Sequence, residues 1–378
     1  MQSLPPPLYW ENAVANYPFT PTVAGLSISV PFIGPEALER TRGVRIRARL
    51  GANESVFGPS LQAIAAMRQA AAESWKYGDP ENHDLKQALA ARHGVKPDNI
   101  VIGEGIDGLH NMTVRLFVEP DVTVATSLGA YPTFNFHVAG YGGRLVTVPY
   151  RNDREDPAAL IDVAKREQAR LIFFANPDNP MGTWWDAGTV KQLIESVPDG
   201  AVLCLDEAYS DFAPESAELP MDVSNPKLLR FRTFSKAHGM AGARIGYAIG
   251  EAGLIRQFDA IRNHFGITRM AQAGALASLG DPEHLAFVIG QVREARDRLG
   301  AIAASHGFQA LPSATNFVAI DCGRDGAYAK SIVDGLVARG IFVRMPGVAP
   351  LNRCIRVSAG TAEDLDAFEE VLGEIVRK

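Results

Sequence analysis

The sequence predicts an α/β protein in which a large domain, built on a mostly parallel and doubly wound sheet, is followed by a smaller α+β domain. Short apolar runs alternate with helix-length segments between residues 100 and 250, which is typical of parallel strands joined by crossover helices. Beyond residue 260, long helical segments surround isolated strand-like runs. The length of 378 residues also favours two domains over one.

The first part of the chain contains an arm and two helices. Residues 1–48 are rich in proline and lack clear periodicity, so we expect an extended arm rather than a domain. Apolar residues at helical spacing predict helices over residues 59–75 and 85–93, and Gly94 ends the second. Strands are then expected at Ile100–Ile102, Val122–Thr126, Leu145–Val148, Leu171–Phe174, Val202–Leu205, Leu229–Phe234 and Ile245–Ile249.

The last part of the chain should form the smaller domain. Strand-like runs occur at Asn316–Ile320 and Ile341–Val343 between long helical segments. Thr361 and Asp364 have the spacing of a capping box, which predicts the start of a terminal amphipathic helix. We therefore expect an arm over residues 1–48, a large domain over 49–265 and a small domain over 266–378.

Composition argues against several classes of function. Lys and Arg total 37 against 43 Asp and Glu, so the basic excess of a general nucleic-acid or anionic-membrane binder is missing. No apolar run reaches the roughly 18 residues that a membrane-spanning helix needs, and the N-terminus lacks the features of an export signal. The three cysteines (Cys204, Cys322 and Cys354) have no metal-binding spacing. We expect a soluble, cytoplasmic protein with reduced thiols and no bound metal, nucleic acid or membrane.

A Gly-rich turn follows the first predicted strand of the large domain. Residues 103–108 (Gly-Glu-Gly-Ile-Asp-Gly) have the spacing of a dinucleotide-binding turn. Such a site needs an acidic residue at the end of the next strand, where residues 127–129 are Ser-Leu-Gly. The turn therefore predicts a more general phosphate site at a helix N-terminus, formed by Gly105, Ile106 and Asp107.

Polar segments follow three of the predicted strands. They are residues 176–182 (Asn-Pro-Asp-Asn-Pro-Met-Gly), residues 206–209 (Asp-Glu-Ala-Tyr) and residues 233–246, which contain Ser235, Lys236 and Arg244. Because open α/β sheets bind ligands at the carboxyl ends of their strands, we expect the three segments to share one crevice. The combination of one lysine, one acid, one asparagine, one tyrosine and one arginine suits pyridoxal 5′-phosphate (PLP).

The chemistry of PLP assigns a role to each of these residues. Lys236 would form the Schiff base with the cofactor and later act as general base. Asp206 would pair with the protonated ring nitrogen, which keeps the ring an electron sink. Asn179 and Tyr209 would donate hydrogen bonds to the ring oxygen. The phosphate would be held by the Gly-rich turn together with Ser235 and Arg244.

These segments resemble those of class I/II aminotransferases of PLP fold-type I, and most closely those of histidinol-phosphate aminotransferases, over about residues 50–360. Residues 53–60 resemble the entry motif of that subfamily, and Tyr77 and residues 132–134 (Pro-Thr-Phe) also have counterparts. The resemblance implies that Asn53 contacts the substrate, that Tyr77 reaches the cofactor phosphate of a neighbouring subunit, and that Phe134 stacks on the cofactor ring. It therefore also implies a homodimer.

The same resemblance implies two arginines for the substrate. Arg356 matches the arginine that grips the α-carboxylate with two hydrogen bonds, and Arg344 is the candidate for the arginine that faces a substrate phosphate. The chain departs from the subfamily pattern at Val56, Met181 and Phe134. These departures remove no catalytic group, but they loosen the assignment to histidinol phosphate.

The expected activity is a ping-pong amino transfer from an amino acid or amino phosphate, either histidinol-phosphate-like or aromatic, to 2-oxoglutarate. One alternative is decarboxylation of a phosphorylated amino acid on the same fold, because the substrate bond that stands perpendicular to the ring is the one that breaks. A second is a non-catalytic ligand sensor, which the presence of Lys236 disfavours. We expect His238, Trp184 and Trp185 to pack rather than to react, and the sequence assigns no role to Met181.

Overall fold

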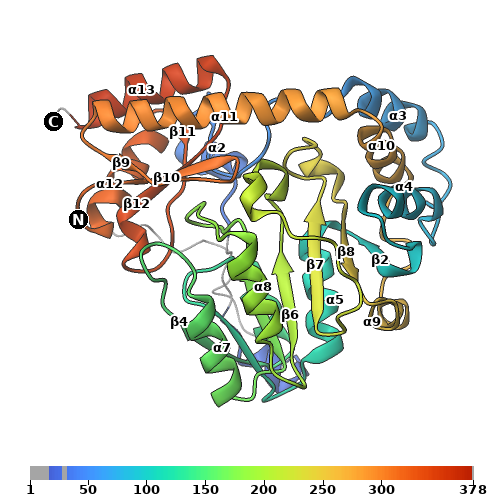
Figure 1. The fold of residues 1–378 in the computed structure, drawn as a ribbon. Coiled ribbons are helices and arrows are strands. Elements are labelled where there is room, and N and C mark those ends of the chain that lie inside the picture. The colour runs from blue at the N-terminus through green and yellow to red at the C-terminus, as the bar shows by residue number, and fades with distance from the viewer. Residues whose placement is uncertain (1–16, 28–31, 377–378) are drawn as a thin grey trace.

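The computed structural model describes residues 17–27 and 32–376 and is dominated by a seven-stranded sheet (Figure 1). Its strand order is β2-β8-β7-β6-β5-β3-β4. Neighbours are parallel from β4 to β7, whereas β8 is antiparallel to both β7 and β2. The predicted mostly parallel sheet is therefore confirmed. The strands are β2 (Ile100–Gly103), β3 (Thr123–Ser127), β4 (Arg144–Val148), β5 (Leu171–Ala175), β6 (Val202–Asp206), β7 (Leu228–Thr233) and β8 (Gly246–Gly250).

Helices cover both faces of this sheet, which explains why β2, β5, β6 and β8 are buried along their whole length. One face packs on α5 (Gly105–Phe117), α6 (Pro132–Gly140) and α9 (Ala252–Gln257), and the other on α7 (Pro157–Arg166) and α8 (Ala187–Glu195). Successive residues of one strand point to opposite faces, so that Phe173 joins the first layer and Phe174 the second. Both side chains are fully buried.

A separate set of strands and helices combines β1, which precedes the large sheet, with elements that follow it along the chain. Three antiparallel strands lie in the order β12-β10-β9, and β1 pairs in parallel with β11. The strands are β1 (Ala48–Arg49), β9 (Gln309–Ala310), β10 (Phe317–Asp321), β11 (Ile341–Phe342) and β12 (Cys354–Ser358). They share a core with α11 (Pro282–Ser305), α12 (Gly326–Val337) and α13 (Ala362–Val376). Helix α11 extends from this core towards the opposite end of the molecule (Figure 1).

That opposite end is formed by α3 (Leu61–Ala71), α4 (His83–His93) and α10 (Arg269–Leu279), and α10 contacts both other helices. The helix expected to end at Gly94 does so, and Gly94 takes the left-handed conformation. The capping box of α13 is also confirmed, because Asp364 Oδ2 accepts from the backbone N of Thr361 (3.0 Å) and Thr361 Oγ1 accepts from the backbone N of Asp364 (3.2 Å). The domain boundaries stay a prediction, and β1 spans the first of them.

Two elements differ from the sequence-based expectation. The stretch expected to be an extended arm contains helices α1 (Pro21–Ala24) and α2 (Pro35–Arg42), and the rest of that arm lies partly outside the described residues. Helix α2 begins with Pro35 after Gly34 and ends where Gly43 takes the left-handed conformation. Proline at the start and glycine after the end are typical of a helix. These two residues indicate the helix better than the weak periodicity of its apolar residues does. Strand β12, which carries Arg356, was not predicted as a strand.

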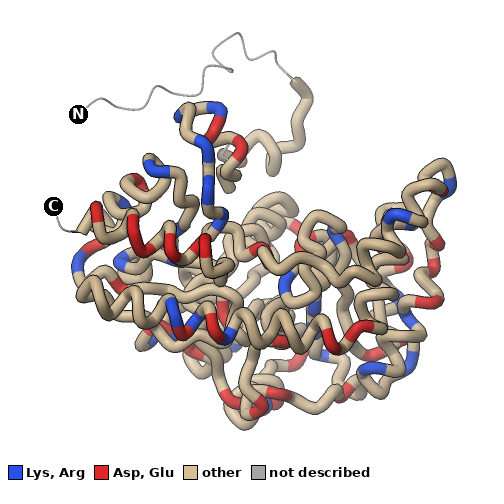
Figure 2. The backbone as a smooth tube through the Cα atoms, turned by 90° about the horizontal axis from the view of Figure 1, so that it is seen from above, with Lys and Arg blue, Asp and Glu red and all other residues tan. Residues whose placement is uncertain are grey.

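Charges of both signs are interspersed along the backbone (Figure 2). This distribution matches the near balance of 37 basic and 43 acidic residues. Over residues 17–27 and 32–376, no helix is long and apolar enough to cross a membrane. The three cysteines are buried and form no disulfide.

Candidate active site

A cavity of about 790 Å³ opens at the carboxyl ends of β5, β6 and β7. Its wall brings together residues that are far apart in the sequence, as expected for the ligand crevice of a parallel sheet. Most of the predicted site residues line the cavity, and the exceptions are Gly105, Phe134 and Tyr77. Those that line it are Asn53, Ile106, Asp107, Asn179, Asp206, Tyr209, Ser235, Lys236, Arg244, Arg344 and Arg356.

Lys236 lies in the turn that follows β7, with its amine inside the cavity. Its Nζ donates a hydrogen bond to the backbone oxygen of Asn53 (3.0 Å) and lies 5.6 Å from the centre of the Tyr209 ring. Burial, assisted by the positive charges of Arg356 and Arg244, lowers the pKa of Lys236 to about 8. A substantial fraction of the amine is therefore neutral near neutral pH, as a nucleophile or general base requires.

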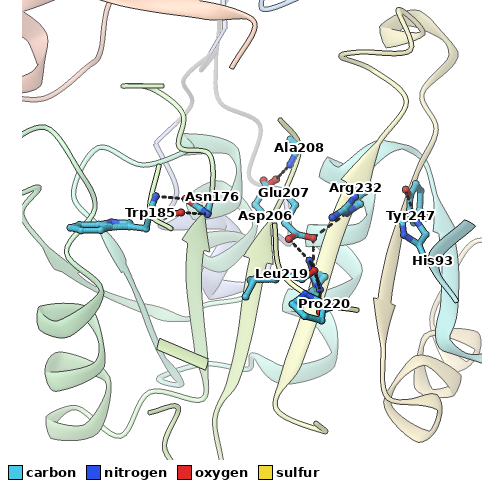
Figure 3. A network of polar contacts seen from close by, with 11 residues as sticks. His93, Asn176, Trp185, Asp206, Glu207, Ala208, Leu219, Pro220, Arg232 and Tyr247 are labelled. Atoms are coloured by element: carbon cyan, nitrogen blue, oxygen red, sulfur yellow. Dashed lines mark hydrogen bonds and ion pairs between the residues drawn. The ribbon is translucent and has the colours of Figure 1, made fainter. Parts of the chain in front are cut away.

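Asp206 ends β6, on the floor of the cavity. Its Oδ1 accepts a hydrogen bond from the backbone N of Ala208 (2.9 Å; Figure 3). Burial raises the pKa of Asp206 to about 7, because the ionised carboxylate has lost most of its water. A cation placed against this carboxylate would favour its ionised form, and the protonated nitrogen of a pyridine ring is such a cation.

The next residue, Glu207, serves a structural purpose. Successive side chains of a strand point to opposite faces, and Glu207 binds Arg230 (2.9 and 2.6 Å) and Arg232 (3.1 Å) on β7. Figure 3 shows Glu207 directed towards Arg232 and away from Ala208, which binds Asp206. Although burial opposes it, the two arginines hold the pKa of Glu207 below its usual value. Of the two adjacent acids, Asp206 therefore faces the cavity.

A group of potential anion-binding donors lies where α5 begins. Ile106 and Asp107 in the first turn of α5 line the cavity beside Ser235 and Arg244, and Arg244 Nη1 lies 3.5 Å from Ser235 Oγ. Gly105 has a φ of +76°, and a Cβ there would lie 2.5 Å from Arg244 Nη2. Glycine is therefore required for the close approach of the helix N-terminus and the guanidinium, both of which attract an anion.

Arg356 on β12 also lines the cavity. Its Nη1 donates to Asn179 Oδ1 (2.6 Å) and its Nη2 to the backbone oxygen of Gly51 (3.2 Å). The buried Nε has no hydrogen-bond partner among the described residues. Burial lowers the pKa of Arg356 to about 10. Because buried donors are rarely left unpaired, this nitrogen fits an anionic ligand.

Arg344 stands beside Arg356 on the same wall. The backbone N of each residue donates to the carbonyl oxygen of the other, at 3.2 and 2.6 Å. The Arg344 guanidinium lies 4.5 Å from the centre of the Phe32 ring, which also lines the cavity. Phe32 belongs to the N-terminal stretch, so sequence reasoning did not place it in the site. The two guanidiniums thus form a cationic wall with an aromatic edge.

The prediction that Phe134 stacks on the cofactor ring is wrong. Phe134 is fully buried and stacks on Phe173, with ring centres 4.4 Å apart. Pro132 begins α6, so Phe134 lies in the first helical turn and faces the sheet, whereas Tyr131 precedes the helix and lines the cavity. The position of Tyr131 immediately before the helix-starting proline was the signal for the aromatic residue that lines the cavity.

Tyr77 lies outside the cavity. Its side chain is 73% exposed, and its ring centre is 4.5 Å from that of Phe265. A contact with the site of a neighbouring subunit stays a prediction for this residue.

The residues left without a chemical role shape the loops around the site. Trp185 donates its backbone N–H to Asn176 Oδ1 (2.8 Å), which holds the loop that leads to Asn179 (Figure 3). Trp184 is half-buried, and Met181 is fully buried among apolar residues of the C-terminal region. The buried His238 contacts Ser278 Oγ (2.7 Å), in keeping with a packing role.

Comparison with known proteins identifies the family of the chain. The model of the family "Aminotransferase class I and II" matches residues 46–372. Histidinol-phosphate aminotransferase 1 of Mesorhizobium japonicum is 34% identical over 365 residues, covering 94% of this chain and 96% of that protein. Histidinol-phosphate aminotransferase of Moorella thermoacetica is 31% identical over 372 residues, covering 97% of this chain and 95% of that protein.

A solved structure extends the similarity to three dimensions. It is the crystal structure of histidinol-phosphate aminotransferase from Sinorhizobium meliloti in complex with pyridoxal-5′-phosphate. Its TM-score to this chain is 0.94 at 54% identity, over 96% of this chain and 99% of that one.

The fold and the cavity define a PLP enzyme of fold-type I. Within that class, the chain belongs to the class I and II aminotransferase family, and it is a PLP-dependent aminotransferase. The predicted family, cofactor and type of reaction are thereby confirmed, whereas the roles of single residues stay proposals.

Proposed function

We propose that the enzyme transfers the amino group of a histidinol-phosphate-like amino phosphate, or of an aromatic amino acid, to 2-oxoglutarate by a ping-pong mechanism. The observation that carries this proposal is the pair of arginines, Arg344 and Arg356, joined through their backbones on one wall of the cavity. Glutamate and 2-oxoglutarate carry an anionic group at each end, and an amino phosphate carries one. Two neighbouring cations can serve both kinds of substrate in a single site.

The residues of the cavity fit the cofactor. The close approach at Gly105 leaves Arg244, Ser235 and the N-terminus of α5 around one anion site, which suits the phosphate of PLP. The buried acid Asp206 suits the protonated ring nitrogen. Tyr131 lines the cavity and offers the aromatic face for the ring that was expected of Phe134.

PLP, when bound, supplies an electron sink that stabilises negative charge at the α-carbon of the substrate. Lys236 Nζ would hold the cofactor as nucleophile, and the same amine would move the proton of the substrate α-carbon as general base. Asp206 accepts the hydrogen bond of the ring N–H. Tyr209 and Asn179 orient the ring oxygen, and the hydrogen bond from Asn53 Nδ2 to the Tyr209 hydroxyl (2.9 Å) holds that hydroxyl in place.

Substrate orientation falls to the cationic wall. Arg356 binds the α-carboxylate of glutamate through its unpaired Nε and a neighbouring nitrogen, with the two-pronged geometry that guanidinium groups favour. Arg344 binds the far anionic group, either the second carboxylate or a phosphate. The Phe32 ring beside Arg344 provides an apolar surface for an imidazole or phenyl side chain.

We further infer that the enzyme works as a cytoplasmic homodimer. Large apolar side chains are exposed near Tyr77, including Trp75 (81%) and Phe265 (51%). Such exposure is typical of a surface that another protein covers, and a second copy would bring Tyr77 within reach of its cofactor site. Light scattering tests the mass in solution, and a monomer that retains full activity would contradict this inference.

The substrate assignment is tested by following the half-reaction of the PLP-loaded enzyme with histidinol phosphate and with phenylalanine. Arg344→Ala should lower kcat/KM for histidinol phosphate by about 10- to 100-fold, the loss expected for one hydrogen bond to a charged group, and should affect phenylalanine less. Arg324→Ala, at an arginine that instead lies against Tyr328, is the matched control.

Equal losses for both donors would contradict the phosphate role of Arg344. Release of carbon dioxide without conversion of the cofactor to its amine form would instead favour the decarboxylase.

A further inference from the structure

A histidine is enclosed in the apolar layer between α5 and the large sheet. His110 is fully buried, and its ring meets Phe134, Phe173 and Phe231 edge-on at centre distances of 5.5, 5.3 and 4.8 Å. Neither ring nitrogen has a hydrogen-bond partner among the described residues. An imidazole left unpaired in such surroundings costs folding free energy, so a polar role needs to be sought.

One acid of the site, Asp206, lies close to this histidine. His110 Nε2 lies 3.8 Å from Asp206 Oδ2, while the other carboxylate oxygen already accepts from the backbone N of Ala208. The separation exceeds a hydrogen bond by less than 1 Å, and contacts at a catalytic site often shorten when the ligand is bound.

We propose that His110 is a positioning residue for Asp206. The Nε2–H of His110 donates to Asp206 Oδ2 and keeps the carboxylate ionised and directed at the ring nitrogen of PLP. The proposal rests on the role of Asp206 in the proposed function. His110 itself does not touch the cofactor site, since it does not line the cavity.

The protonation state of His110 supports this geometry. Burial lowers its pKa to about 3, so the ring is neutral and carries a single N–H. The other titratable groups that face it are Asp107 on α5, His137 on α6 and Tyr131 before α6. Asp107 and His137 are hydrogen-bonded to each other (3.1 Å). Asp107 is thus already paired with His137, whereas Asp206 Oδ2 lies 3.8 Å from His110 Nε2.

Asp206 has a need for such a donor. Burial raises its pKa to about 7, and the negative charge of Glu207 acts in the same direction, whereas the Ala208 N–H and the charge of Lys236 oppose it. A protonated Asp206 cannot pair with a protonated ring nitrogen. Loss of the His110 donor should raise the pKa of Asp206 further, so that cofactor binding weakens more at pH 6 than at pH 8.

The test compares two replacements of His110. Gln places an amide N–H near the position of Nε2, whereas Met fills the space without a donor. The dissociation constant of PLP is measured on the apo-protein by equilibrium dialysis at pH 6 and pH 8, and thermal unfolding of the apo-proteins is followed in parallel. H110M should weaken PLP binding at pH 6 by about 10- to 100-fold, which is the range for one hydrogen bond to a charged group. The loss of affinity should be smaller at pH 8. H110Q should bind PLP nearly as tightly as the wild type.

Two outcomes would overturn the proposal. One is PLP binding by H110M that equals wild type at both pH values. The other is an equal loss in H110M and H110Q that follows their thermal stability, which would make His110 a packing residue. The Asp206→Asn variant distinguishes these results from a failure of the proposed function. If Asp206→Asn binds PLP as the wild type does, then Asp206 does not pair with the ring nitrogen, and the proposed role of Asp206 itself is wrong.

Discussion

Substitution of Gly105 by alanine tests the phosphate site through a single added methyl group. The new Cβ would lie 2.5 Å from Arg244 Nη2, so the guanidinium must move by about 1 Å to reach an ordinary contact distance. Because the end of an arginine side chain moves easily, the steric cost to folding is small. The φ of +76° adds about 1 kcal/mol for a residue with a Cβ.

The larger effect of Gly105→Ala should be on the cofactor. The displaced guanidinium loses its place beside Ser235, and the loss of one charge-assisted hydrogen bond to phosphate should weaken PLP binding by about 10- to 100-fold. Titration of the apo-protein with PLP, followed by fluorescence, measures this loss. Gly94→Ala is the matched control, because Gly94 has a φ of +65° and a Cβ added there would have nothing within 4 Å.

Both glycine variants should therefore lose a similar amount of stability, and Gly105→Ala alone should lose affinity for PLP. Wild-type affinity in Gly105→Ala would refute the placement of the phosphate between α5 and Arg244.

Three further predictions follow from the buried groups of the site. Since the pKa of Lys236 is about 8, the rate at which the apo-protein binds PLP covalently should rise with pH up to about 8 and level off above it. A rate that does not change with pH would contradict attack by the neutral amine. Glu207→Gln leaves the buried Arg230 and the partly exposed Arg232 without their carboxylate and should lower the free energy of unfolding by about 3–5 kcal/mol. The exposed Asp334→Asn should lower it by less than about 0.5 kcal/mol, and urea denaturation measures both. Tyr131→Ala should weaken PLP binding, whereas Phe134→Leu should lower the melting temperature and leave the cofactor spectrum unchanged; the reverse pattern would restore Phe134 to the site.

The sequence predicts the architecture of the large sheet and most of the site because both depend on local patterns. Each strand is an apolar run bounded by polar residues, and Asn179, Asp206 and Lys236 follow such runs in segments of recognisable spacing. Once the strands are parallel, their carboxyl ends meet without further information. This is why residues distant in the chain could be assigned to one crevice.

Other features depend on packing that no local pattern records. Whether Tyr131 or Phe134 faces the cofactor is decided by where α6 begins, and a shift of three residues turns a side chain from the cavity to the core. Phe32 reaches the site through tertiary contacts of an N-terminal stretch. His110 falls at a regular apolar position of α5, so its approach to Asp206 becomes visible only when β6 and α5 are packed together.

The whole proposed mechanism depends on Lys236 as the residue that anchors PLP in this cavity. Reduction of the PLP-loaded protein with borohydride, followed by proteolysis and mass spectrometry, locates the residue that carries the cofactor. We predict a phosphopyridoxyl group on the peptide that contains Lys236, and none after Lys236→Ala. A label on another lysine, or a wild-type protein that remains unlabelled with excess PLP, would contradict the account.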